Sequence, residues 1–294
     1  MAQKTSRTLP EPQPVDAGLH LVATPIGNLR DISLRALDVL QAADRIYAED
    51  TRVARKLLDA YGIATRAQAC HDHNEAHVLG SVLAALEAGE CVALVSDAGT
   101  PLISDPGYKI ARGAIEAGHA VHALPGACAP ITALTVSGLP SDRFLFDGFP
   151  PSKTTARRKR YEALASVPAT LIFFESGPRL AASLADMLAV FGPRDAAVAR
   201  ELTKKFEEVR RDTLEVLAAH YVDNGPPRGE IVVLVGGPQA GAGVWTEADV
   251  DAALTEAIQT LGVKGASSAV ADVSGWTKRD LYARAQTLKD AGAK

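Results

Sequence analysis

A short apolar strand, a long loop rich in glycine and proline, and a helix follow one another between Cys91 and Ala117. The strand covers 92–95, and the loop carries Ser, Thr and Asp side chains between its glycines and prolines. A strand-to-helix connection needs only about two to six residues, whereas this loop runs for about a dozen. Loops of this kind present backbone N–H groups to a ligand at the carboxyl edge of an open α/β sheet. The stretch therefore predicts a binding loop in an α/β fold, with a ligand-free connection as the alternative.

The same order of strand, polar loop and helix recurs in the first half of the chain. Strand-like segments lie at 19–23, 45–48, 92–95 and 119–124. Strands that alternate with helices predict a parallel sheet with right-handed crossovers. The loops that begin at Thr24, Glu49, Ser96 and Pro125 should then meet at one edge of this sheet and form one composite site. Asp31 is expected to cap the helix after the first of these loops.

A second block begins near Ser141, and its strands and helices follow in a mixed order that indicates antiparallel pairs. Strands are expected at 143–149, 170–174, 196–200, 205–210 and 230–235, and helices at 154–165, 179–191 and 214–221. A glycine-rich linker at 236–243 precedes three short helices. The predicted parts are a disordered leader (1–17), an N-terminal α/β domain (18–138), a second α/β domain (139–238), and a linker with a helical tail (239–294).

The composition is that of a soluble globular protein, with 47% hydrophobic and 22% charged residues. The net charge of −4 offers no global attraction to nucleic acid, so RNA or DNA would have to bind through a local patch. Three cysteines without a pairing pattern predict reduced thiols and a cytoplasmic location. The chain has no apolar run of membrane-spanning length, and the polar, proline-rich start does not have the pattern of a signal peptide.

Familiar catalytic signatures are absent from the sequence. It contains neither the dinucleotide-binding G-x-G-x-x-G, nor the phosphate-binding G-x-x-x-x-G-K-[ST], nor the G-x-S-x-G of α/β hydrolases. His71, His73 and His77 invite a metal-site interpretation, with Asp72 and Glu75 as further ligands. The spacing lacks the second half of the ligands of a zinc module. A polar loop is favoured instead, in which Asn74 caps the helix that follows. No metal is predicted.

Several charged groups fall where the composite site is expected. Candidates for proton transfer or charge stabilisation are Glu49, Asp50, Asp105, Glu175, Glu201 and Lys204. A capping role for Asp50 and structural ion pairs for Glu175 and Glu201 are equally open interpretations. The stretch 153–160 packs five cations into an otherwise acidic protein, which favours contact with a polyanion over a merely solvated helix face. The predicted RNA-binding residues are Lys153, Arg157, Arg158, Lys159 and Arg160.

These motifs together resemble a known family. The matching stretches are LVATPIGNLRDIS (21–33), AEDTR (48–52), HDHNEAH (71–77), VSDAGTPLISDPG (95–107), LPGACA (124–129), FFES (173–176), ARELTKKFEE (199–208), RGEIVVLV (228–235) and the tail at 263–285. The chain resembles the tetrapyrrole methylases, the class III S-adenosylmethionine-dependent methyltransferases. Within them it is most similar to the ribosomal small-subunit methyltransferase I family, the 16S rRNA (cytidine 2′-O)-methyltransferases.

The resemblance implies two α/β domains with the cofactor in the cleft between them, which agrees with the mainly parallel first sheet, the mixed second sheet and the small helical tail predicted above. It also implies S-adenosylmethionine as cofactor, ribosomal RNA or the small ribosomal subunit as partner, and a homodimer. Carried over by motif, the cofactor-binding residues are Pro25, Gly27, Asn28, Asp97, Ala98, Gly99, Thr100, Pro101, Ser104, Pro125, Gly126 and Ala127.

The implied reaction is in-line methyl transfer to a ribose 2′-hydroxyl, for which alignment supplies much of the rate and a carboxylate accepts the proton. The sequence does not select one carboxylate among the candidates. Two alternatives remain: a methyltransferase of a porphyrinoid small molecule, and a non-catalytic RNA-binding module. Methylation of a porphyrinoid in vitro would favour the first, and failure to bind S-adenosylmethionine would favour the second.

Overall fold

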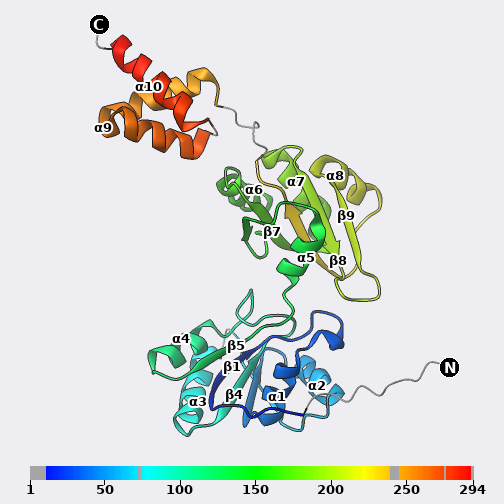
Figure 1. The fold of residues 1–294 in the computed structure, drawn as a ribbon. Helices are drawn as coiled ribbons and strands as arrows, with labels where there is room; N and C mark the ends of the chain where they lie inside the picture. The colour runs from blue at the N-terminus through cyan, green and yellow to red at the C-terminus, as the bar shows by residue number, and fades with distance from the viewer. Residues whose placement is uncertain (1–10, 72–73, 239–244, 275, 293–294) are drawn as a thin grey trace, which may run out of the picture.

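The structure is a computed structural model that describes residues 11–71, 74–238, 245–274 and 276–292. Two five-stranded sheets follow one another along the chain, each with helices packed against it, and a pair of long helical segments ends the chain (Figure 1). The predicted α/β class, with a parallel first sheet, a mixed second sheet and a helical tail, is confirmed.

The first sheet is entirely parallel and has the strand order β3-β2-β4-β1-β5. Its strands are β1 (Gly18–Val22), β2 (Arg45–Ala48), β3 (Ala67–Ala69), β4 (Cys91–Val95) and β5 (Val121–Leu124). The helices are a 3-10 turn at Leu29–Asp31, α1 (Leu34–Ala42), α2 (Thr51–Ala60), α3 (Glu75–Glu87) and α4 (Tyr108–Glu116). Apolar residues of α1 and α2 pack on one face of the sheet and those of α3 and α4 on the other.

The strand register brings the carboxyl ends of the central strands level with one another. Val95 at the end of β4 pairs with Val22 of β1 and with Ala48 of β2, and Val22 also pairs with Leu124 of β5. The loops that leave these four strands therefore start side by side, as the alternation of strands and helices predicts.

The second sheet has the order β6-β7-β10-β8-β9, in which only β6 and β7 are parallel. Its strands are β6 (Phe144–Phe146), β7 (Thr170–Ser176), β8 (Asp195–Arg200), β9 (Glu208–Thr213) and β10 (Glu230–Val235). Helices α6 (Thr154–Leu164), α7 (Gly177–Phe191) and α8 (Leu214–Asp223) share one apolar core on one face of this sheet.

Helix α5 (Ala129–Ser137) covers the other face, and the sequence pattern did not predict it. It contacts β7, β8, β9 and β10, so by packing it belongs with the second sheet although it precedes the predicted boundary at 138. Its apolar cluster also contains Ile26 from the loop after β1 and Leu202 from the loop after β8. Apolar packing thus continues from one domain into the other at this point.

Three local predictions are corrected. Ser33, not Asp31, caps α1, because the Ser33 hydroxyl accepts the Ala36 N–H at 3.1 Å. The strand expected at 205–210 is β9 at Glu208–Thr213, since residues 201–207 form a tight turn with positive φ at Glu201 and Thr203. The strand expected at 143–149 ends at Phe146.

The tail consists of α9 (Glu247–Ser274), which is interrupted at Gly262, and α10 (Lys278–Gly292). These helices enclose an apolar cluster of their own that includes Val250, Leu254 and Leu281. The start of the leader and most of the predicted linker lie outside the described residues. None of the helices in the described ranges is long and apolar enough to cross a membrane.

Candidate functional site

Three of the converging loops are joined by hydrogen bonds. The backbone groups of Thr24 and Gly99 bond to each other in both directions, at 2.8 and 3.0 Å, which links the loops after β1 and β4. The Thr100 hydroxyl donates to the carbonyl of Ala127 at 3.0 Å and adds the loop after β5. The Ser96 hydroxyl donates to the Gly99 carbonyl at 2.9 Å. The loops therefore form one continuous floor.

The central loop, residues 96–107, has an unusual backbone. Gly99 has φ +86°, and Leu102 and Ser104 have φ +71° and +66°, values that side chains disfavour. Such conformations persist only where the surroundings hold them, and they gather at ligand sites. The far end of the loop is held by buried Glu75, whose Oε1 accepts the Gly107 and Lys109 N–H groups at 3.1 and 2.8 Å.

The turn at 201–207 of the second domain rests on the loop after β1. The Asn28 N–H donates to the Thr203 hydroxyl at 3.1 Å. A Cβ on Gly27 would lie 2.4 Å from Lys204 Cγ and 2.9 Å from the Leu202 carbonyl oxygen, so only glycine permits this approach. Gly27 and Asn28 thus contribute here to the contact between domains.

A cavity of about 410 Å³ lies between the central loop and the second sheet. It is lined by Ile26, 97–100, 103–105, 128–130, Phe149, 174–176, Ala199, Leu202 and 229–232. Most of these side chains are apolar or small. The charged residue types among the described lining residues are all acidic: Asp97, Asp105 and Glu230, and also Glu175, whose carboxylate is fully buried and paired with Arg179. The cavity therefore suits a ligand with an apolar body and positive charge, and it disfavours a phosphate.

The structure divides the predicted cofactor residues into two groups. Asp97, Ala98, Gly99, Thr100 and Ser104 line the cavity. The others are absent from its lining: Pro101 of the same loop, and Pro25, Gly27, Asn28, Pro125, Gly126 and Ala127 of the adjoining loops. Gly126 serves packing, since a Cβ there would lie 2.6 Å from Ala23 Cβ.

The sequence pattern did not identify the second-domain wall of the cavity. This wall includes Phe149, Phe174, Ala199 and Leu202, together with residues 229–232. Most of these residues lie in the matched stretches 173–176, 199–208 and 228–235, but they are apolar or lie at strand ends, so their residue types do not show which of them face the cavity. The register of β10 with β7 and β8 would have been needed to find them.

The acidic candidates after β2 and β4 differ in their environments. Asp50 caps α2 and pairs with Arg52 at 2.6 Å, and this hydrogen-bonded guanidinium lowers the pKa of Asp50 to about 2. The Asp50 N–H donates to Asp97 Oδ1 at 2.9 Å.

Burial is the main cause that raises the pKa of Asp105 to about 7, and the nearby charges of Glu49 and Asp97 raise it further. A hydrogen bond with Ser96 has a smaller, opposing effect. Among the six candidates, Asp105 best combines a place on the cavity wall with a pKa suited to a base.

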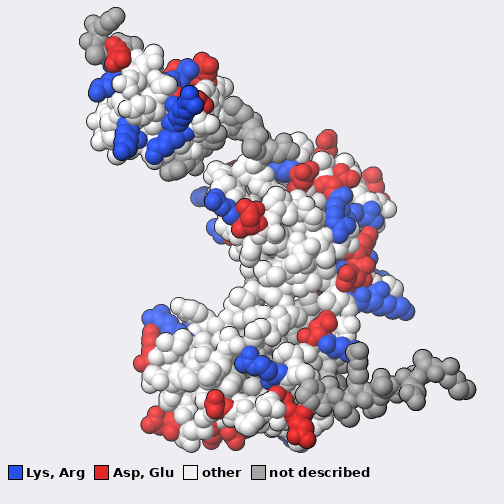
Figure 2. All heavy atoms as spheres, viewed as in Figure 1, with Lys and Arg blue, Asp and Glu red and all other residues white. Residues whose placement is uncertain are grey.

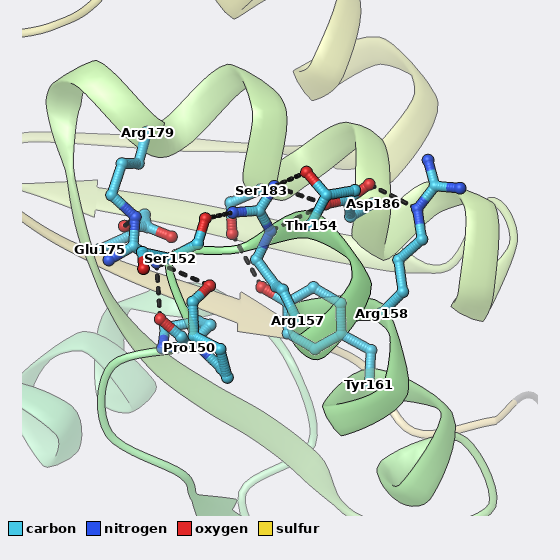
Figure 3. A network of polar contacts seen from close by, with 11 residues as sticks. Pro150, Ser152, Thr154, Arg157, Arg158, Tyr161, Glu175, Arg179, Ser183 and Asp186 are labelled. Carbon is cyan, nitrogen blue, oxygen red and sulfur yellow. Dashed lines mark hydrogen bonds and ion pairs between the residues drawn. The ribbon is translucent and has the colours of Figure 1, made fainter.

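The prediction that the Glu175 carboxylate acts in the site is contradicted by its orientation. Ile172 and Phe174 of β7 belong to the cluster on the α5 side, whereas Leu171 and Phe173 belong to the cluster under α6 and α7. Since side chains alternate along a strand, Glu175 points toward α6 and α7. Its side chain is 0% exposed and pairs with Arg179 at 3.3 Å, so it is a structural ion pair (Figure 3).

Glu201 and Lys204 also form an ion pair. Lys204 Nζ lies 2.9 Å from Glu201 Oε1 and 3.1 Å from Glu230 Oε2. The hydrogen bond from Lys204 lowers the pKa of Glu201, which makes Glu201 a poor base. Burial alone would lower the pKa of Lys204, but the two carboxylates outweigh it and raise that pKa. Lys204 stays charged beside the cavity, next to Gly27.

The basic stretch on α6 is largely committed to internal pairs. Arg157 is 3% exposed and bonds to Asp186 on α7 at 2.5 and 2.8 Å, and Arg158 bonds to the other oxygen of Asp186 at 2.6 Å (Figure 3). Arg160 pairs with Asp147. The prediction that Arg157 contacts RNA is therefore wrong, because its guanidinium is buried. Lys153 and Lys159 are exposed and stay candidates.

The histidine-rich segment has a structural role, because its Glu75 accepts hydrogen bonds from the end of the central loop. Asn74 precedes α3, but its side chain accepts the His71 N–H at 2.8 Å instead of capping the helix. Within the described residues, no three His, Cys, Asp or Glu side chains are grouped so as to hold a metal. Asp72 and His73 lie outside these residues.

Comparison with known proteins agrees with this architecture. Residues 18–218 match the sequence model of the Tetrapyrrole (Corrin/Porphyrin) Methylases, and residues 246–289 match one described as the RsmI C-terminal HTH domain. The chain therefore belongs to the tetrapyrrole methylase family, as its motifs predict.

Its relatives carry a more specific name. The chain is 53% identical over 279 residues to the Mesorhizobium japonicum protein named Ribosomal RNA small subunit methyltransferase I, covering 95% of this chain and 94% of that one. It is 48% identical to the Pseudomonas aeruginosa protein of the same name, covering 91% and 96%. Among solved structures, uroporphyrin-III-C-methyltransferase from Thermus thermophilus shares the fold with a TM-score of 0.54 and 23% identity, covering 77% of this chain and 96% of that one.

Proposed function

We propose that this protein transfers a methyl group from S-adenosylmethionine to a ribose 2′-hydroxyl, that of a cytidine, in small-subunit ribosomal RNA. The observation that carries the proposal is the acidic, largely apolar cavity built on the 96–107 loop, in a chain whose relatives are named as rRNA small-subunit methyltransferases. The predicted homodimer and cytoplasmic location remain predictions.

The residues of the cavity fit S-adenosylmethionine. This cofactor carries a sulfonium, an ammonium and a carboxylate group, so it is a net cation without a phosphate, and Asp97 and Asp105 supply the opposite charge. Gly99 brings bare backbone to the cavity floor, where a Cβ would lie 3.2 Å from Ile26 Cγ2. Asp97, Gly99, Thr100 and Ser104 are the residues we assign to holding it. Bound there, the cofactor supplies an electrophilic methyl group on a positively charged sulfur.

We assign to Asp105 the acceptance of the 2′-hydroxyl proton. A hydroxyl becomes an effective nucleophile when a base takes its proton as the new bond forms, and a base with a pKa near the working pH does so best. Burial and the neighbouring carboxylates place the pKa of Asp105 in that range. Lys204 is bonded to Glu201 and Glu230 at the junction of the two domains and is absent from the cavity lining, so we assign it to holding the two domains together and not to the transfer step.

The experiment is methyl transfer in vitro with labelled S-adenosylmethionine and small ribosomal subunits from cells that lack this protein. Nuclease digestion and mass spectrometry should then find one new 2′-O-methyl nucleotide. Transfer to a base would contradict the proposal, as would transfer only to an added porphyrinoid. Failure to bind the cofactor, measured by calorimetry, would favour the non-catalytic alternative.

A further inference from the structure

Phe149 exposes 60% of its surface even though it lines the cavity. Its ring packs at a tilt of 52° against that of Phe174, with 5.2 Å between ring centroids, and Phe174 also lines the cavity. Ile103 of the central loop, 40% exposed, lines the cavity as well. Phe149 and Ile103 are the large apolar side chains among the described lining residues that are exposed. The cavity is therefore bordered by an exposed aromatic ring and an exposed aliphatic side chain.

The loop that carries Phe149 is braced on both sides of the ring. Before the ring, the Asp147 N–H donates to the Ile172 carbonyl and the Phe174 N–H to the Gly148 carbonyl, each at 2.9 Å. After it, Arg179 Nη2 donates to the Pro150 carbonyl at 2.6 Å (Figure 3). A side chain on so firmly held a loop keeps its place without a ligand, which lowers the entropic cost of binding.

Two arginines that hold the backbone of this loop are themselves fixed by buried acidic residues. Arg179 is itself held by Glu175, and Arg157, fixed by Asp186, donates to the carbonyl of Ser152 at 3.1 Å (Figure 3). The charged groups that the sequence suggested for catalysis and RNA contact thus fix the backbone around Phe149.

The charge of the cavity limits which part of a nucleotide can enter it. Its acidic residues disfavour a phosphate but not a neutral base and ribose. Figure 2 shows mostly uncharged atoms along the concave edge between the two α/β domains. Proteins that act on a nucleotide in a folded RNA take it out of its stack and hold the exposed base against aromatic side chains.

We propose that Phe149 is the stacking platform for the base of the target nucleotide, and so positions the ribose for methyl transfer. The inference rests on the proposed function, because it takes RNA as the substrate. It assigns the ring to the RNA and not to the cofactor.

The test compares Phe149→Ala and Phe149→Tyr with the wild type. Removing one stacked ring costs about 1–3 kcal/mol, so Phe149→Ala should raise the KM for small ribosomal subunits about 5- to 150-fold. The affinity for S-adenosylmethionine, measured by calorimetry without RNA, should change less than about twofold. Phe149→Tyr, which keeps the ring, should restore most of the RNA affinity.

Phe144→Ala is the matched control, because Phe144 is 45% exposed on β6 of the same domain and does not line the cavity. Equal KM values for Phe149→Ala and Phe144→Ala would overturn the inference and leave the proposed function intact. A fall in cofactor affinity as large as the rise in KM would assign the ring to the cofactor and also overturn it. A wild-type protein that methylates no rRNA would overturn both.

Discussion

Asp105 combines a place on the cavity wall with a raised pKa. Asp97 lines the cavity, but its Oδ1 already accepts the Asp50 N–H, and Asp50 has a strongly lowered pKa because Arg52 holds its carboxylate. Asp105 lines the cavity and has its pKa raised by burial, Glu49 and Asp97. A carboxylate kept partly protonated near neutral pH is costly to the fold, which is the expected mark of a functional group.

The raised pKa of Asp105 predicts how activity and stability depend on pH. As the base, Asp105 must be ionised, so kcat/KM should rise with pH through about 7. Because its pKa is higher in the folded than in the unfolded state, Asp105 destabilises the fold increasingly as pH rises from about 4 to 7. Asp105→Asn should lower kcat by about 10²- to 10⁴-fold, because the amide cannot accept the proton.

Thermal unfolding provides the independent readout for Asp105. Without cofactor, Asp105→Asn should melt at a higher temperature than the wild type at pH 8, and the difference should vanish below about pH 4. A variant that keeps its activity and the pH profile of the wild type would exclude Asp105 as the base.

Gly99 provides a second prediction for a single residue. Gly99→Val puts a branched side chain on a left-handed backbone, 3.2 Å from Ile26 Cγ2, and should weaken S-adenosylmethionine binding at least about tenfold. Gly89→Val is the control, since Gly89 has φ +77° but has nothing within 4 Å of its Cβ position. If both variants bind the cofactor equally well, the loop is not its floor.

At the scale of helices and strands, the sequence predicted the elements that follow the repeated order of strand and helix. It missed features that depend on contacts between distant segments of the chain. The alternation of strands and helices was sufficient for four strands of the first sheet and for its loop edge, but not for the short edge strand β3. Helix α5 was missed because its apolar residues follow a proline-rich loop, and its partners lie about 40 to 100 residues further on. The orientation of Glu175 was missed because both faces of β7 are covered, so the strand reads as a continuous apolar run.

Glu75 links two helices and fixes the end of the central loop. Glu75→Ala removes the acceptor of the Gly107 and Lys109 N–H groups in a buried position and should lower the free energy of unfolding by about 2–4 kcal/mol. Cofactor affinity should fall too, because the loop loses its anchor. Urea unfolding and calorimetry measure both effects.

The control for Glu75 lies on the same helix. Glu87→Ala, where the side chain is 84% exposed, should leave both quantities nearly unchanged. Equal stability of the two variants would show that Glu75 does not hold the loop.

At the scale of the whole molecule, an acidic protein must attract RNA through local cations. Figure 2 shows acidic and basic side chains interspersed on the visible face. Changing Arg157 would disrupt the α6–α7 pairing, because the buried Asp186 would lose a partner. The exposed Lys153 and Lys159 are therefore the residues with which to test the patch on α6.

Lys153→Glu with Lys159→Glu should weaken RNA binding and reduce the slope of log affinity against log salt by roughly one unit for each phosphate that the protein no longer neutralises. Cofactor affinity should be unchanged, because neither lysine lines the cavity. Lys56→Glu with Arg66→Glu makes the same change of charge at exposed positions of the first domain. If both pairs alter the slope equally, the effect is one of net charge and not of the patch.

The central claim is that this chain methylates a ribose of small-subunit rRNA, and mapping of modified nucleotides tests it most directly. Small-subunit rRNA from cells with and without this protein is digested and compared by mass spectrometry. The account predicts that one 2′-O-methylcytidine is lost without the protein, returns with the wild-type chain, and does not return with Asp105→Asn. An unchanged set of 2′-O-methyl nucleotides in cells that lack the protein would contradict it.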